Sequence, residues 1–563
     1  MATTLTEAIE LARQGNLAEA RQLAGILLAD SPLEAETHHF LGVLDNIEKR
    51  PLQAIVRFQQ AIELEGGVAK YHSNLGNAQL AVGRVEAAEA SYRQALALQP
   101  DFLPAGYNLA YQWFRADRPS EALALLGQFA SCEDADTQAL LARLHLRLNH
   151  PAEAIFHYHK ALAVDGNQID VIAELANLHE TLNDIDAAQR RVDQGLAIDS
   201  GHAFLRVIQA RLMRRRKEFE EAANRLSNMP YDRLDDRLAA GALNEWGLDL
   251  DALHRPGEAM EKFAAAKSRQ ARLYPDLPRH AAEYRAQLET TLRLDCRALH
   301  EQSVGNMEPT PVFLVGFPRS GTTLLEQILD SHPDIQALEE KPLIEALIAA
   351  HPEHFNQTGA ALPLPAQTRQ TLQSLYFDLA AQHLIHQPGK MWLDKYPLNL
   401  TRIHRILQIF PAARFILALR HPCDIMVSCQ MHLFDLNPAM ANFHSLHDSA
   451  RLYALAMHLW AKFRDELQPC YWTVRYENLV RQRDDEIAAL LDFLSLPWHD
   501  GTRCHTEHAR TRGHINTPSY HQVVEPIHTR ASGRWLRYRA ELAPVFPLLA
   551  PAMDIAGYPV PTA

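Results

Sequence analysis

The stretch that decides the fold is Phe317-Pro318-Arg319-Ser320-Gly321-Thr322-Thr323. It follows an apolar run, Val312–Val315, which predicts a buried β-strand. It precedes apolar residues at helical spacing, namely Leu324, Leu325, Ile328 and Leu329. A strand, a tight glycine turn and a helix form a cradle for anions, because backbone N–H groups and the positive helix end converge there. The sequence therefore predicts an anion-binding loop.

The spacing of this loop narrows the choice of anion. Its frame runs Gly316-x4-Gly321 and then Thr322-Thr323. A nucleoside triphosphatase has lysine where Thr322 stands, and that lysine neutralises the β- and γ-phosphates. The frame thus disfavours ATP and GTP, and Arg319 supplies a positive charge from inside the loop.

Composition sets the outer limits of function. The chain has 563 residues, which predicts two or three domains, and a net charge of −13, which disfavours general binding of nucleic acid. Six scattered cysteines without a CxxC pair suggest neither a disulfide framework nor a zinc ribbon. No basic and apolar leader and no membrane-spanning stretch is apparent, so we expect a cytoplasmic protein. His157-x-His159 and Cys504-His505-x-x-His508 complete no four-ligand set, and we expect no metal.

Residues 1–270 are repetitive. Alanines recur at spacings near 34 residues. A second series, which includes Leu41-Gly42 and Leu75-Gly76, lies 13 residues ahead of most of these alanines, and a third series of mostly large residues, which includes Phe58 and Tyr92, follows the alanines by four. The alanines are Ala20, Ala54, Ala88, Ala122, Ala154, Ala188, Ala222 and Ala259. Small residues allow two helices to approach closely, and the large residues fill the groove beside them. The pattern resembles the tetratricopeptide repeat, with about eight units.

Such a repeat array predicts an all-α solenoid whose concave groove binds a peptide or protein partner. The alternative is that the solenoid only spaces or dimerises the chain. We expect a helical linker over residues 271–308. From residue 309 to 563, short apolar runs alternate with helical segments, which predicts one α/β domain with a parallel sheet. The predicted strands are Val312–Val315, Phe415–Leu419 and Tyr471–Val474.

The motifs of this second half resemble those of the sulfotransferase superfamily, and most of all the tyrosylprotein sulfotransferases. They are GFPRSGTT, LEEKP, LDKYP, RFILALRHPCDIMVS and RYENL, in that order. The resemblance implies a P-loop-type α/β domain that uses 3′-phosphoadenosine 5′-phosphosulfate (PAPS) as co-substrate, releases 3′-phosphoadenosine 5′-phosphate (PAP) and needs no metal.

The resemblance also implies roles for individual residues. Arg319, Ser320, Gly321, Thr322 and Thr323 would hold the 5′-phosphosulfate, and Arg319 would also stabilise charge on the bridging oxygen. The remaining positions are Glu340 as base, with Glu339 as competitor; Lys395 as electrostatic stabiliser; Arg420 and Ser428 for the 3′-phosphate; Tyr476 near adenosine; Ser519 at the reacting sulfate; and Arg534, with Arg530 as competitor, over the 3′-phosphate.

Two departures from the tyrosylprotein enzymes bear on the acceptor. Pro342 stands where they have an arginine two residues after the second glutamate, and the chain shows no membrane anchor. A soluble fusion of a solenoid to a sulfotransferase looks bacterial. We expect tyrosine in a recruited peptide or protein as acceptor. The alternatives are a saccharide, lipid or small metabolite, or a non-catalytic scaffold with a degenerate nucleotide fold.

Overall fold

The computed structural model describes residues 4–300, 310–356, 359–384, 386–504, 506 and 529–561. The chain forms two compact units, Met1–Leu205 and Arg206–Ala563. Each unit is described by itself. The domain boundaries predicted at residues 270 and 308 stay predictions.

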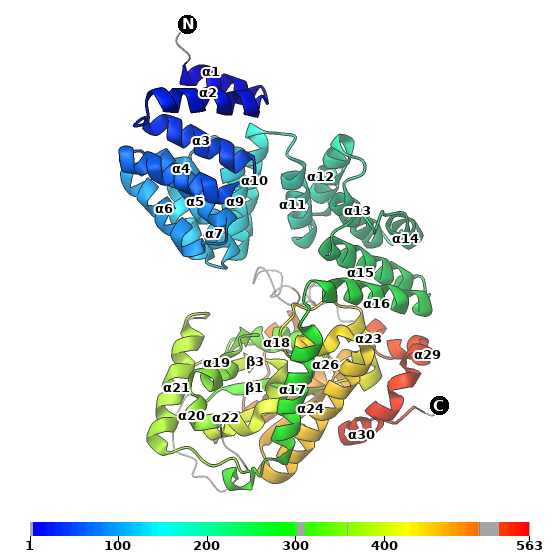
Figure 1. The fold of residues 1–563 in the computed structure, drawn as a ribbon. Helices are drawn as coiled ribbons and strands as arrows, with labels where there is room; N and C mark the ends of the chain where they lie inside the picture. Colours follow the sequence, from blue (N-terminus) through cyan, green and yellow to red (C-terminus); the bar gives the residue numbers. More distant parts are fainter. Residues whose placement is uncertain are drawn as a thin grey trace. The chain divides into compact units, whose positions relative to one another are not determined.

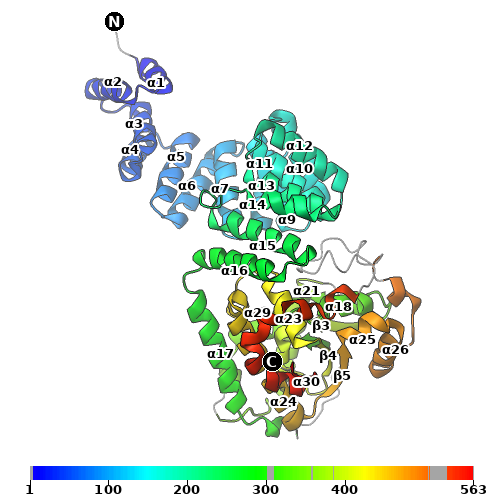
Figure 2. The ribbon, with the colours of Figure 1, turned by 90° about the vertical axis from the view of Figure 1, so that its right-hand side faces the viewer.

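Helices in successive pairs make up the whole of the first unit and the start of the second (Figures 1 and 2). In the first unit they are α1 (Leu5–Arg13), α2 (Leu17–Asp30), α3 (Ala35–Ile47), α4 (Pro51–Leu64), α5 (Ala69–Ala81), α6 (Val85–Leu98), α7 (Leu103–Arg115), α8 (Pro119–Leu126), α9 (Ala135–Arg147), α10 (Pro151–Val164), α11 (Ile169–Thr181) and α12 (Ile185–Ile198). Helix α13 (Ala203–Arg215) spans the boundary, and α14 (Phe219–Ser227), α15 (Asp236–Ala252) and α16 (Pro256–Arg272) belong to the second unit.

The paired helices pack as the small-and-large pattern predicts. All eight alanines of the repeat series are fully buried. A Cβ atom added to Gly42 would lie 2.7 Å from the ring of Phe58, and one added to Gly76 would lie 2.6 Å from that of Tyr92. Real Cβ contacts are not so short, so glycine is required for α3 and α4, and for α5 and α6, to approach this closely. The predicted all-α repeat fold is confirmed.

The second unit contains a five-stranded parallel sheet in the order β2-β3-β1-β4-β5. The strands are β1 (Val312–Gly316), β2 (Ile335–Glu339), β3 (Met391–Lys395), β4 (Arg414–Leu419) and β5 (Cys470–Arg475). The predicted central parallel sheet is confirmed. The sequence indicated β1, β4 and β5 but missed β2 and β3, which carry polar residues and lack a long apolar run.

The remaining helices of this unit cover the sheet. They are α17 (Leu277–Arg293), α18 (Thr322–Asp330), α19 (Leu343–Ala350), α20 (Pro352–Phe355), α21 (Ala366–Ala381), α22 (Ile403–Ile409), α23 (Pro422–Gln430), α24 (Leu446–Leu467), α25 (Tyr476–Arg481), α26 (Arg483–Leu494), α29 (Arg539–Leu542) and α30 (Phe546–Ala556). Short 3₁₀ turns are η1 (Gly127–Phe129) in the first unit and, in the second, η2 (Arg297–Leu299), η3 (Pro397–Arg402), η4 (Met440–His444), η5 (Asp500–Cys504), η6 (Thr529–Ala531), η7 (Arg534–Tyr538) and η8 (Ala543–Val545).

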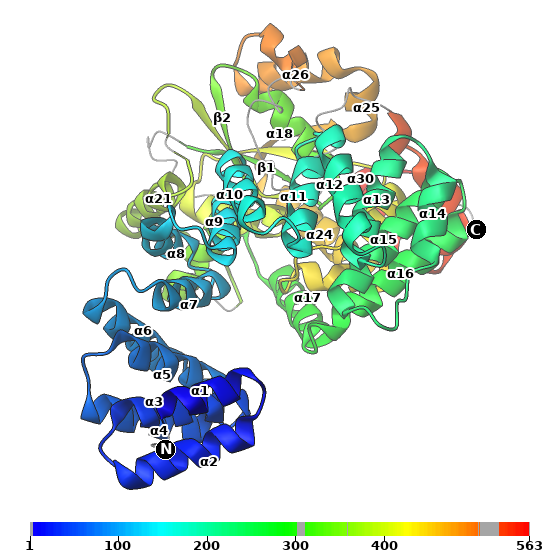
Figure 3. The same cartoon turned by 90° about the horizontal axis from the view of Figure 1, so that it is seen from above.

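The two faces of the sheet bury different cores. One face packs α18 and α26 against Val312, Leu314 and Ile416. The other buries Phe313 and Leu417 among residues of α21, α22 and α24. Helix α17 runs beside α24 (Figures 1 and 2). Helices α25 and α26 come after the edge strand β5 in the chain and lie side by side (Figure 3). Alternate side chains of a strand point to opposite faces, and strands β1 to β4 are buried on both faces, as is usual in parallel sheets. The edge strand β5 is mostly part-buried.

Candidate functional site

Predicted site residues gather at the carboxyl edge of the sheet. Lys395 is the last residue of β3, and Glu340, Arg420 and Tyr476 each follow the last residue of β2, β4 and β5. The loop Phe317–Thr323, called the glycine loop below, follows β1. Since all five strands are parallel, their carboxyl ends lie along one edge. This edge is where open α/β sheets bind ligands.

The glycine loop and the strand end before it are folded so tightly that Gly321 and Gly316 leave no room for a side chain. Gly321 caps α18 with a φ of +99°, and a Cβ there would lie 2.7 Å from the ring of Tyr476. A Cβ on Gly316 would lie 2.7 Å from both the Ala418 carbonyl oxygen and Ser320 Oγ. Ser320 is buried, and its Oγ has no hydrogen-bond partner among the described residues. A buried hydroxyl without a partner at a helix N-terminus fits an anion acceptor there. Thr322 and Thr323, the first residues of the helix, are buried as well.

Arg319 joins the glycine loop to the predicted 3′-phosphate residues. It adopts a positive φ of 73°, and its Nε donates a 3.0 Å hydrogen bond to Ser428 Oγ. Arg420 Nη1 in turn donates to the Arg319 carbonyl oxygen at 3.1 Å. Burial lowers the pKa of Arg319 to about 10; the thiol of Cys429 opposes this shift, and Arg420 adds to it. A buried cation and a part-buried cation held so close together favour an anion between or beside them.

Arg420 is buried and contacts three parts of the unit. Its Nη2 donates to the Ala531 carbonyl oxygen at 2.5 Å, and its guanidinium lies 4.8 Å from the centre of the Tyr476 ring. Arg534 Nη1 lies 3.1 Å from Met431 Sδ, just beyond the helix that carries Ser428. The Nε atoms of both arginines are buried without a hydrogen-bond partner among the described residues. These donors fit the oxygens of a phosphate group.

Lys395 is fully buried among three carboxylates. Its Nζ lies 2.8 Å from Glu340 Oε1, 3.0 Å from Glu326 Oε2 and 3.9 Å from Glu339 Oε1. Burial by itself would lower the pKa of Lys395, but Glu326, Glu340 and Glu339 outweigh it and raise that pKa above its ordinary value. Lys395 therefore carries a positive charge at neutral pH.

Glu340 has an unusual backbone for a non-glycine residue. Its φ is +44°, and its N–H donates to the Lys395 carbonyl oxygen at 2.9 Å. Its side chain keeps 37% of its surface exposed, whereas that of Glu339 keeps 16%. Left-handed backbone in such a residue is strained, and strain of this kind gathers at functional sites. Glu340 is therefore the more accessible of the two candidate bases.

Two acidic residues that the sequence analysis missed orient Arg534. Asp424, in the first turn of α23, accepts hydrogen bonds from the N–H groups of Gly533, at 2.7 Å, and Trp535, at 2.8 Å. Asp251, from helix α15, lies 3.9 Å from Arg534 Nη1. The contact of Asp424 fixes the turn from which Arg534 projects. In the sequence, Asp424 has only the signal of an acidic residue at a helix start.

Ser519 and Arg530 are the two remaining candidates near the end of the chain. Ser519 lies outside the described residues, so its predicted role stays a prediction. Arg530, the competitor of Arg534, is exposed in η6, whereas Arg534 is partly buried at the start of η7. The placement favours Arg534 as the residue that faces the site.

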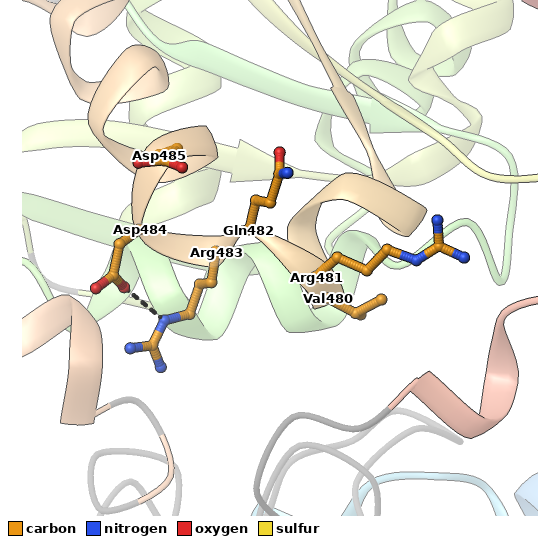
Figure 4. Close-up of a pocket in the computed structure, with 6 residues that line it drawn as sticks. All are labelled: Val480, Arg481, Gln482, Arg483, Asp484 and Asp485. Carbon is orange, nitrogen blue, oxygen red and sulfur yellow. Dashed lines mark hydrogen bonds and ion pairs between the residues drawn. The ribbon is translucent and has the colours of Figure 1, made fainter.

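Two further features lie apart from the predicted site. A hollow of about 350 Å³ is lined by residues 480–485, between α25 and α26, and its side chains splay outward (Figure 4). Among the described residues, His351, Glu353 and His354 hold their potential ligand atoms within 4.8 Å of one another, all partly or fully exposed. Neither feature includes a residue of the sheet edge. Within the described ranges, no helix is long and apolar enough to cross a membrane.

Comparison with known proteins agrees with this geometry. Residues 311–500 match the model of the sulfotransferase family, and residues 69–102 match that of the tetratricopeptide repeat. The first match contains the glycine loop, Glu340, Lys395, Arg420 and Tyr476, whereas Arg534 lies beyond it.

Sequence relatives lead to the same family. An uncharacterised protein of Aquifex aeolicus is 28% identical over 286 residues, covering 47% of this chain and 36% of that protein. Protein-tyrosine sulfotransferase 1 of Danio rerio is 27% identical, covering 48% of this chain and 81% of the relative. Nodulation protein NoeE of Sinorhizobium fredii is 32% identical, covering 33% of this chain and 50% of that protein. The chain thus spans about a third of the Aquifex protein and half of NoeE. By these matches, residues 311–500 are similar to the sulfotransferase family, and residues 69–102 are similar to the tetratricopeptide repeat.

Proposed function

We propose that the second unit transfers a sulfuryl group from PAPS to an acceptor hydroxyl. The observation that carries this proposal is the contact of 2.8 Å between Lys395 Nζ and Glu340 Oε1. It brings a buried cation and an accessible carboxylate together at the ends of β3 and β2, on one side of the strand that leads into the glycine loop. A base and a charge stabiliser in contact are what sulfuryl transfer from a fixed donor requires.

The donor's two anionic ends match two groups of residues. The N–H groups of the glycine loop and the free hydroxyl of Ser320, with Thr322 and Thr323, would hold the 5′-phosphosulfate. Arg420 with Ser428 and Arg534 would hold the 3′-phosphate, and the Tyr476 ring beside Arg420 would border the adenosine. The hydrogen bond from Arg319 to Ser428 supports placing the two ends near each other.

The reaction then needs no group beyond these side chains. The bond between sulfur and the bridging phosphate oxygen breaks, and a new bond forms between sulfur and the acceptor oxygen. Glu340 takes the proton of the acceptor hydroxyl. Lys395 and Arg319 stabilise the charge that develops on the bridging oxygen as PAP leaves, in a loose transition state like that of phosphoryl transfer. We propose no metal requirement.

The acceptor we favour is a tyrosine in a peptide or protein held by the repeat groove. Relatives named protein-tyrosine sulfotransferase support this choice, and a tethered substrate would be present at high effective concentration. Pro342 bears against recognition of acidic peptides, because it supplies no positive charge at the position where those enzymes have arginine. A saccharide, lipid or small metabolite is the alternative acceptor for the same site.

Mass spectrometry of acceptors tests the proposal. The purified protein is incubated with PAPS and either tyrosine-containing peptides or oligosaccharides, and added sulfate is measured. We expect sulfated peptides, loss of turnover in E340Q, and retained turnover in the matched variant E339Q. Full turnover by E340Q would remove Glu340 as the base, and sulfated oligosaccharides alone would overturn the peptide acceptor.

A further inference from the structure

Glu326 is a charged residue in an apolar setting. It lies in the second turn of α18, between Leu325 and Ile328, which pack into the core on one face of the sheet. Its side chain has no exposed surface. A carboxylate without access to water is costly to bury and is kept only where it has a fixed partner. Lys395 is such a partner, because its Nζ lies 3.0 Å from Glu326 Oε2.

The Lys395 ammonium shares its charge between two close carboxylates that differ in surroundings. Glu326 approaches it from the helix that follows the glycine loop, and Glu340 approaches it from the end of β2. Glu326 is fully buried on a helix, whereas Glu340 is over a third exposed and follows a strand with strained backbone. Only Glu340 has water available to replace the ammonium.

An ammonium has three donors but a single positive charge, so an arriving anionic oxygen competes for that charge with the carboxylates already beside it. Glu340 is the carboxylate that is released at lower cost, because water solvates it once the contact breaks. Glu326 stays bound, because its side chain has no exposed surface and no water can take the place of the ammonium. The asymmetry keeps Lys395 charged and in place while freeing Glu340 to accept a proton.

We propose that Glu326 is a positioning residue for Lys395, which holds the ammonium from the α18 side so that Glu340 is the partner released when the donor binds. The inference rests on the proposed function and extends it to a residue outside the predicted site. Glu326 itself touches neither the donor nor the acceptor in this account.

A double-mutant cycle tests the inference with the full-length chain. The variants are E326Q, which keeps the shape and removes the charge, K395M, and the double variant. The matched control is E345Q, which removes a carboxylate that contacts Arg402 and Tyr396 and not Lys395. The readouts are kcat, KM for PAPS and the melting temperature.

We expect E326Q to lower kcat by about tenfold or more while KM for PAPS changes by less than about threefold. We expect the double variant to match K395M within about threefold, because Glu326 acts through Lys395. E345Q should retain the wild-type kcat. If E326Q keeps the wild-type kcat, or lowers it by the same factor in the K395M background, the inference is wrong.

Two further outcomes also bear on the inference: an E326Q variant that does not fold, and a wild-type protein that shows no turnover. If E326Q does not fold, E326D replaces it: this variant keeps the charge but draws it back from Lys395, and a wild-type kcat for E326D would overturn the inference. If the wild-type protein transfers sulfate to no acceptor, the proposed function fails and the inference with it. Wild-type turnover with an unaffected E326Q would remove the inference alone.

Discussion

Replacement of Gly321 by alanine tests the geometry on which the site depends. The residue has a φ of +99°, and the added Cβ would lie 2.7 Å from Cδ2 of Tyr476. The left-handed backbone costs about 1–2 kcal/mol for a residue with a Cβ. Displacing a packed aromatic ring adds about 1–3 kcal/mol. We therefore expect G321A to lose about 2–5 kcal/mol of unfolding free energy in the second unit.

Gly389 provides a matched control. It also has a positive φ, of +86°, but a Cβ there would meet nothing within 4 Å. G389A should therefore show only the backbone cost of about 1–2 kcal/mol. The assay is denaturant unfolding of both variants, followed by calorimetric titration with PAP.

The affinity for PAP also separates displacement of the Tyr476 ring from the backbone cost alone. Tyr476 lies over Arg420, so a displaced ring disturbs the predicted 3′-phosphate residue. We expect G321A to bind PAP at least about tenfold more weakly than wild type and G389A to bind it equally well. Equal unfolding free energies for G321A and G389A, with equal PAP affinities, would refute the reasoning.

Two further changes have defined outcomes. Burial raises the pKa of Asp394 to about 7, so the folded protein favours the neutral form and loses about 4 kcal/mol as pH rises from 4 through 7. D394N keeps the acceptor for the hydroxyl of Tyr376 and should gain stability over wild type across that range; parallel pH profiles from thermal unfolding would contradict this. D424N removes one of the two carboxylate oxygens of Asp424 that accept hydrogen bonds from the turn at Gly533. Arg534 then loses its support, so PAP binding should weaken about tenfold, with little change in Tm. Unchanged affinity in calorimetry would exclude that role.

Local patterns explain what was predictable from the sequence. The glycine loop has a strong pattern, because strand, glycine turn and apolar helix follow each other within 18 residues, from Val312 to Leu329. Strands β4 and β5 have apolar runs of their own. Strands β2 and β3 do not, since Gln336 and Asp394 interrupt them. Gln336 accepts a hydrogen bond from the Gln387 N–H, and Asp394 accepts one from the buried Tyr376 hydroxyl. Tertiary contacts thus stabilise two strands that the sequence pattern does not indicate.

Contacts between distant segments explain what was not predictable. Glu326 lies on one face of α18 and meets Lys395, 69 positions later in the chain, only because β3 pairs with β1. Asp251 and Asp424 meet the segment around Arg534 across still longer separations. No periodicity encodes such pairs. The predicted residues followed strand ends, whereas the missed ones support them from neighbouring helices.

The central claim is that the sheet edge binds a nucleotide with phosphates at both the 3′ and 5′ positions. Calorimetric titration with PAP, adenosine 5′-monophosphate and ATP tests it without knowledge of the acceptor. We predict that PAP binds at least about tenfold more tightly than either of the others, since a charge-assisted phosphate contact to Arg420 and Arg534 is worth at least about 1.4 kcal/mol. We also predict that R420M abolishes this preference. Equal affinity for PAP and adenosine 5′-monophosphate, or tighter binding of ATP, would contradict the account.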